Sequence, residues 1–116
     1  MAQYFKVDIH GDSWNIYIVD DDDIVIDEDN DAETDIENKE IHFKRGGINE
    51  VSVRHEIWHA YMAYTFTETA DLTSGQSEEV SAQIFGVRGP EMVEKAAMIY
   101  KKLKELKDKP VKRRNK

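Results

Sequence analysis

The hydrophobic pattern of this chain changes its period at Gly46-Gly47, and that change limits the folds open to it. Before the glycines, the segments YFKVDIH (4–10), WNIYIV (14–19) and KEIHFKR (39–45) alternate or run apolar with β-branched and aromatic residues, which predicts strands. After them, apolar residues recur every three or four positions, which predicts helices. Strands followed by helices indicate an α+β fold, and we expect an N-terminal antiparallel or mixed β-sheet followed by three α-helices.

Turn residues divide the first half of the chain. Gly11-Asp12-Ser13 supplies turn chemistry between the first two strands and predicts a β-hairpin or two sequential strands. The four aspartates at 20–23 repel one another and end the second strand, and Ile24-Val25-Ile26 predicts a short further strand. The stretch 27–35 is polar and acidic, and we expect a loop there.

Helix-capping and helix-breaking residues divide the second half of the chain into predicted helices. Asn49 is a favourable N-cap, and the apolar spacing after it predicts a helix over 50–66. A second helix is predicted over 78–85, where Gly86–Gly89 ends it. Pro90 then occupies a favourable first-turn position, and the apolar spacing that follows predicts a third helix.

The composition sets limits on domain number, metal ligands and location. The chain has 116 residues, which predicts one domain over 1–107 with a basic, disordered tail at 108–116. It has no cysteine, so a metal must be bound by His, Asp or Glu. The start MAQYFKVDIHG is no secretory signal, and no apolar run approaches the ~18 residues of a membrane span. We expect a soluble, cytoplasmic protein that does not enter a membrane.

Charge is distributed unevenly along the chain. The formal net charge is −8, but residues 101–116 carry +7, so residues 1–100 carry −15. Eleven of the eighteen residues from Asp20 to Glu37 are acidic. Because nucleic-acid binding requires Lys and Arg to neutralise phosphates, we expect no nucleic-acid partner beyond weak contacts of the basic tail.

The most informative motif is His55-Glu56-Ile57-Trp58-His59, which matches the H-E-x-x-H pattern of zinc metalloproteases. Positions four apart lie on one face of a helix, so the imidazoles of His55 and His59 can bind one zinc ion. Zinc lowers the pKa of a bound water molecule towards ~7, and Glu56 can then act as the general base. The motif therefore predicts two metal ligands and one catalytic residue.

A catalytic zinc site needs a third protein ligand and an open position. The metzincin pattern requires Gly at 62 and His at 65, where this chain has Met62 and Thr65. The acids that follow the motif remain as candidates: Glu68, Asp71, Glu78 and Glu79. The strand–helix–loop–helix order resembles the gluzincins, whose third ligand is a glutamate on a later helix, and this resemblance favours Glu79 over Glu78 and Asp71.

A closer family resemblance lies in two neighbouring stretches. VSVRHEIWHAYM, followed by EVSAQIFG at 79–86, resembles the small zinc peptidases of the ImmA/IrrE type. In that family a helix with HExxH precedes a second helix patterned E-x-x-A-N-x-F-A. The matching residues are Glu79, Ala82 and Phe85, whereas Gln83 stands in place of Asn and Gly86 in place of the final Ala.

The resemblance covers roughly residues 39–86 and implies a minimal zincin-like domain with one zinc ion. It implies that His55, His59 and Glu79 are the ligands and that Glu56 is the base. It also implies cleavage of a protein substrate, such as a phage or stress-response repressor. We therefore predict a zinc metalloendopeptidase of the HExxH type. The alternative is a non-catalytic phage or mobile-element interaction protein with a structural zinc site.

Other residues near the motif carry weaker functional predictions. In zincins an edge strand forms the upper rim of the cleft, and KEIHFKR (39–45) is the expected candidate for binding a peptide by β-augmentation. His42 on that strand could face the cleft, although a surface position is favoured. Tyr61 and Tyr64 could donate to an oxyanion, although packing is favoured for both.

The acidic segment is a rival site. DNDAETDIENKE (29–40) has oxygen ligands at positions one, three, five and twelve, as in a calcium loop. Position six is Thr34 rather than Gly, and helical flanks are lacking, so a solvated acidic loop is favoured. Its negative charge beside the cleft would attract basic peptides, which makes a basic protein or peptide the expected substrate.

Overall fold

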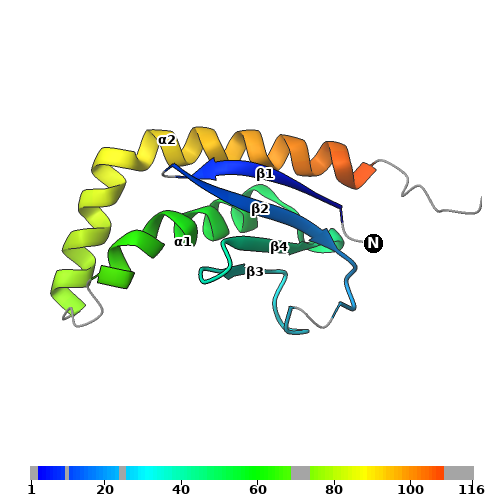
Figure 1. The fold of residues 1–116 in the computed structure, drawn as a ribbon, viewed down its shortest axis with the longest axis horizontal. Helices are drawn as coiled ribbons and strands as arrows, with labels where there is room; N and C mark the ends of the chain where they lie inside the picture. Colours follow the sequence, from blue (N-terminus) through cyan, green and yellow to red (C-terminus); the bar gives the residue numbers. More distant parts are fainter. Residues whose placement is uncertain (1–2, 10, 24–25, 69–73, 109–116) are drawn as a thin grey trace, which may run out of the picture.

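The computed structural model describes residues 3–9, 11–23, 26–68 and 74–108. The elements in chain order are β1 (Gln3–Ile9), β2 (Asp12–Val19), β3 (Ala32–Asp35), β4 (Glu40–Lys44), the short 3-10 helix η1 (Arg45–Gly47), α1 (Glu50–Glu68) and α2 (Ser74–Asp108) (Figure 1). This confirms the α+β class and the order of sheet first and helices second. The expected count of three helices is wrong, because the described residues form two α-helices.

The four strands form one mixed sheet in the order β1-β2-β4-β3. β1 and β2 are an antiparallel hairpin, and Gly11 in its turn has a φ of 80°, which glycine adopts without strain. β2 pairs in parallel with β4, and β4 pairs antiparallel with β3. The short strand expected at 24–26 falls on residues 24 and 25, which lie outside the described part of the chain.

The edge of the sheet is not the strand that the comparison with zincins predicts. KEIHFKR forms β4, which lies between β2 and β3, so its expected role as the rim strand is wrong. The edge is β3, inside the stretch expected to be a loop. Pairing with β4 stabilises this short strand through the backbone, and such pairing leaves little trace in the side chains of Ala32–Asp35.

α2 is one helix although glycine and proline interrupt its sequence pattern. Gly86, Gly89 and Pro90 all lie inside Ser74–Asp108. A glycine in a helix costs only about 1 kcal/mol, and a proline bends a helix without always ending it. Figure 1 shows this bend in the yellow part of α2, the stretch that contains these residues. Neither described helix has an apolar stretch of the length that crossing a membrane requires.

The core lies between one face of the sheet and the two helices. Alternate residues of the strands face it, as the registers Phe5↔Ile16 and Ile16↔Ile41 show. The helices contribute Val53, Ile57, Ala60 and Tyr61 from α1, and Met92, Ala96, Ile99 and Leu103 from α2. This packing explains why the segment after Pro90 stays helical: its apolar side chains are needed to cover the sheet.

The carboxyl end of α2 is fixed by side chains that come from the sheet region. Gln3 Nε2 donates to the carbonyl oxygen of Leu106 at 3.1 Å, and Arg45 donates to that of Lys107 at 3.4 Å. Arg45 also donates to Gln3 Oε1 at 2.9 Å. These contacts satisfy carbonyl groups in the last turn that lack partners within the helix.

Candidate metal centre

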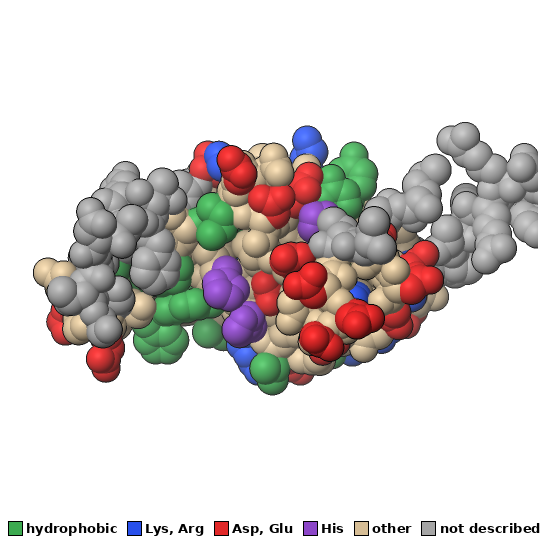
Figure 2. Space-filling view, turned by 90° about the horizontal axis from the view of Figure 1, so that it is seen from below, with side chains coloured by type: hydrophobic (Ala, Val, Ile, Leu, Met, Phe, Trp, Pro, Cys, Tyr) green, Lys and Arg blue, Asp and Glu red, His purple; other side chains and the backbone are tan. Residues whose placement is uncertain are grey.

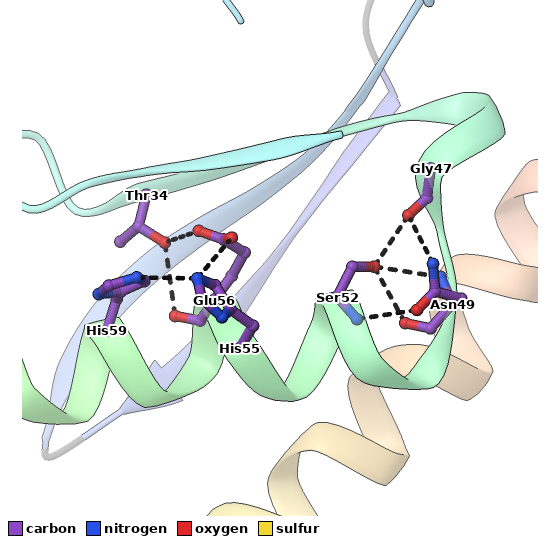
Figure 3. Close-up of polar contacts among 7 residues, drawn as sticks. All are labelled: Thr34, Gly47, Asn49, Ser52, His55, Glu56 and His59. Carbon is purple, nitrogen blue, oxygen red and sulfur yellow. Dashed lines mark hydrogen bonds and ion pairs between the residues drawn. The ribbon is translucent and has the colours of Figure 1, made fainter. Parts of the chain in front are cut away.

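The start of α1 is fixed by a reciprocal cap, which sets the position of everything that follows on the helix. The backbone N–H of Ser52 donates to Asn49 Oδ1 at 2.9 Å, and the backbone N–H of Asn49 donates to Ser52 Oγ at 3.2 Å. The Ser52 hydroxyl also donates to the Gly47 carbonyl oxygen at 2.8 Å (Figure 3). The predicted N-cap at Asn49 is therefore confirmed.

One turn further on, the two histidines of the motif point to the same place. Their Nε2 atoms are 3.1 Å apart, and their rings meet edge to face with centroids 4.8 Å apart (Figure 3). A tetrahedral zinc ion with Zn–N bonds of about 2.0–2.1 Å separates two nitrogen ligands by about 3.3 Å. His55 and His59 thus fit two positions of such an ion. At this distance one ring can also donate a hydrogen bond to the other, depending on the tautomer.

Glu56 lies beside this pair but is buried, with 7% of the residue exposed. The Thr34 hydroxyl donates to Glu56 Oε1 at 2.6 Å. Glu56 Oε2 lies 3.9 Å from His55 Nε2 (Figure 3). One carboxylate oxygen is therefore held by Thr34 of β3, and the other faces the imidazole of His55.

The third predicted ligand is not part of this cluster. Glu79 and Glu78 are exposed on α2, and no three His, Asp or Glu side chains converge on a metal position within the described residues. Ile84 packs against the core, and five residues of helix place Glu79 about 140° around the axis from it. The side chains of Glu68 and Asp71 lie outside the described part of the chain. The structure brings together His55, Glu56 and His59, and Glu79 stays a prediction.

His42 faces away from the candidate centre. It pairs in register with Tyr17 and stacks on that ring at 4.8 Å, on the sheet face opposite to the helices. Its Nε2 lies 3.7 Å from Glu40 Oε1. The possibility that His42 faces the cleft is therefore wrong, and the ring has a packing role on the outer sheet face.

Tyr61 is a core residue that connects the two helices. It is 1% exposed, and its hydroxyl donates to Glu91 Oε2 at 2.8 Å. Burial, with the hydrogen bond to Glu91, raises the pKa of Tyr61 well above its ordinary value. The hydroxyl is thus used inside the fold, as the preference for packing predicts, whereas the Tyr64 side chain lies outside the described residues.

The segment 29–40 does not form a calcium loop. β3 occupies Ala32–Asp35 in its middle, where a loop ligand set would need turns. Asp35 accepts hydrogen bonds from the backbone and side-chain amides of Asn38 at 3.1 and 2.8 Å, and these bonds hold the pKa of Asp35 below its ordinary range. Its carboxylate is committed to the turn that leads into β4.

Sequence reasoning missed one contact within the centre and one hollow elsewhere between the helices. Thr34, which donates to Glu56, lies in a stretch rich in acids, and its β-branched side chain is the one local indication of a strand. The other feature is a small apolar hollow of about 100 Å³ between the helices, lined by Trp58, Phe85, Met92 and Val93 among others. Its signal is the exposed Phe85, whose ring lies 6.1 Å from that of Trp58.

The surface around the histidines has two different sides. Figure 2 shows an adjacent pair of imidazoles (purple) with Asp and Glu side chains (red) gathered on one side and apolar side chains (green) on the other. The exposed acids belong largely to the segment from Asp20 to Glu37. Comparison with protein-family models, with curated proteins and with solved structures finds no match to this chain. The resemblance to the ImmA/IrrE type therefore stays a prediction that rests on the two motifs.

Proposed function

We propose that this chain is a zinc-dependent peptidase that hydrolyses peptide bonds in a protein substrate with basic segments. The observation that carries this proposal is the arrangement on α1: two solvent-facing Nε2 atoms 3.1 Å apart, beside a buried carboxylate with one oxygen turned towards them. A buried acid is costly to keep in a fold, and such groups concentrate where chemistry needs them.

Each residue of the motif has a separate role in this proposal. His55 and His59 hold the metal, with Glu79 as the proposed third protein ligand. Zinc bound there would acidify a water molecule and polarise the peptide carbonyl. Glu56 would take the proton from the attacking water and return it to the leaving amine, which explains why its free oxygen must face the imidazoles.

The sheet edge supports a peptide substrate. β3 pairs with β4 on one side, lies at the end of the sheet and packs against α1. An extended peptide can add to such an edge through backbone hydrogen bonds. The acids around β3 would attract Lys and Arg side chains of the substrate at low salt.

Metal analysis tests the ligands first. We expect about one zinc per chain in the wild type and loss of zinc in His55→Ala and His59→Ala, because either change leaves too few ligands. Glu79→Ala should also lose zinc, whereas its neighbour Glu78→Ala serves as the matched control and should keep it. If His55→Ala matches the wild type in zinc content, the metal site is not on α1 and the proposal fails.

A cleavage assay tests the reaction. A denatured basic protein is incubated with zinc-loaded wild type and with Glu56→Gln, and fragments are followed by mass spectrometry. Cleavage by the wild type alone supports catalysis by Glu56. Equal cleavage by both contradicts it, and retained zinc with no cleavage by either favours the non-catalytic interaction protein.

A further inference from the structure

The contact between β3 and α1 depends on the register of the sheet. Thr34 is opposite Ile41, which is opposite Ile16, and both isoleucines are fully buried in the core. Thr34 therefore belongs to the row of side chains that faces the helices, whereas its neighbours Glu33 and Asp35 face the other side. The only polar side chain on the core side of β3 is thus placed over α1, within the described strand.

The hydrogen bond that results is short and directed at one atom. Thr34 Oγ1 lies 2.6 Å from Glu56 Oε1 and 3.4 Å from the Glu56 backbone carbonyl oxygen. A hydroxyl carries one proton, so the shorter contact to the charged oxygen takes it. This leaves Glu56 Oε2 as the oxygen that faces His55 Nε2, at 3.9 Å.

The donor itself has little freedom to move. Threonine is β-branched and has few χ1 rotamers in a strand, and the backbone of Thr34 is held by its pairing with β4. The acceptor, Glu56, lies on α1, whose first turn is capped. Its carboxylate is buried. Both ends of the bond are thus fixed by the fold, as a group that orients a reacting side chain requires.

We propose that Thr34 is a positioning residue for Glu56, and that its hydroxyl keeps one carboxylate oxygen on the imidazole side of α1. The inference deepens the proposed peptidase function and rests on it. Thr34 lies on β3, the edge strand that we propose for substrate binding. The same residue therefore connects this strand with the proposed base, Glu56.

The test compares Thr34→Val, which keeps the shape but removes the donor, with Thr34→Ser, which keeps the donor. For zinc-loaded enzymes on one cleaved substrate, we expect kcat to fall roughly tenfold or more in Thr34→Val, with KM and zinc content unchanged. Thr34→Ser should stay close to the wild type. Tyr4→Phe, which removes an exposed hydroxyl from β1 at the opposite end of the sheet, is the matched control and should keep the wild-type kcat.

Crystal structures of the same variants give a readout that does not depend on cleavage. We expect the Glu56 carboxylate to leave its position in Thr34→Val and to keep it in Thr34→Ser. An unmoved carboxylate in Thr34→Val, or an unchanged kcat, overturns the inference while the peptidase proposal stands. A wild type that cleaves nothing overturns the proposed function instead. If Thr34→Val does not fold, Thr34→Ala removes the same donor and replaces it.

Discussion

Two hydrogen bonds of the same chemical type connect α1 to its neighbours, and they differ in which partner is buried. Thr34 on β3 donates to Glu56 at 2.6 Å, and Tyr61 donates to Glu91 on α2 at 2.8 Å. In the first bond the carboxylate is buried and lies beside exposed imidazoles. In the second the phenol is buried, and the carboxylate reaches solvent.

Under the proposed function, the first bond serves chemistry and the second serves packing. Burying a carboxylate costs free energy, and the Thr34 hydroxyl and the His55 imidazole lie close enough to the Glu56 carboxylate to offset part of that cost. Burying a phenol against a half-exposed carboxylate costs little, and it joins two helices. We therefore expect changes at Glu56 to alter activity and changes at Tyr61 to alter stability.

The largest expected effect comes from replacing Glu56, the acceptor of the first bond and the proposed base. Glu56→Gln keeps the shape but removes the base, so kcat for peptide cleavage should fall by about 10²–10⁴. Glu91→Gln is the matched change in the second bond, retains an acceptor oxygen for Tyr61, and should leave kcat unchanged. Comparable losses of kcat in both variants would contradict the division between the two bonds.

The second prediction concerns stability. Tyr61→Phe removes the buried hydroxyl and should lower the free energy of unfolding by about 1–2 kcal/mol, measured by urea denaturation. Cleavage below the unfolding temperature should not change. Tyr4→Phe, at a residue that is 55% exposed, is the control and should shift stability by less than about 0.5 kcal/mol.

The stability of the protein at alkaline pH should test the second bond further. The folded state raises the pKa of Tyr61, so above its ordinary value of about 10 the unfolded chain releases a proton that the folded chain retains. The stability contributed by Tyr61 is therefore complete below that value and is lost as pH rises above it. Urea unfolding from about pH 8 to about pH 11 should show a steeper loss for the wild type than for Tyr61→Phe. Parallel curves would mean that the phenol is not held neutral by the fold.

The smallest effect concerns the outer partner of Glu91. Arg88 lies 3.3 Å from Glu91 Oε1, and the two side chains are 47% and 44% exposed. Solvent screens such a pair, so Arg88→Ala should cost no more than about 0.5 kcal/mol, and less at high salt. A cost equal to that of Tyr61→Phe would show that the ion pair contributes as much as the phenol to holding α2 against α1, and would contradict this ranking.

The sequence predicts those strands and helices that bury one face, because this burial leaves a periodic pattern of apolar residues in the local sequence. β1, β2, β4 and α1 lie within a few residues of their predicted bounds, because each places apolar residues on a single face of the core. The pairing of His55 with His59 follows from helix geometry alone, and Asn49 caps α1 as expected. These features need no information from distant residues.

The remaining features depend on contacts between distant segments. β3 exists because β4 offers it a backbone partner, and Thr34 reaches Glu56 only through the register of the whole sheet. α2 continues through Gly89 and Pro90 because the residues after them are required to cover the strands. In both places, long-range contacts override the local preferences for turns and helix breaks.

The side chains that hold the end of α2 have a consequence for the synthesis of the protein. Gln3 and Arg45 leave the ribosome long before Leu106 and Lys107, whose carbonyl oxygens they bind. Translation proceeds at about 5–20 residues per second, so for several seconds α1 alone is available to cover the apolar face of the strands. We therefore expect the nascent chain to be open to aggregation, and to need a chaperone, until α2 emerges.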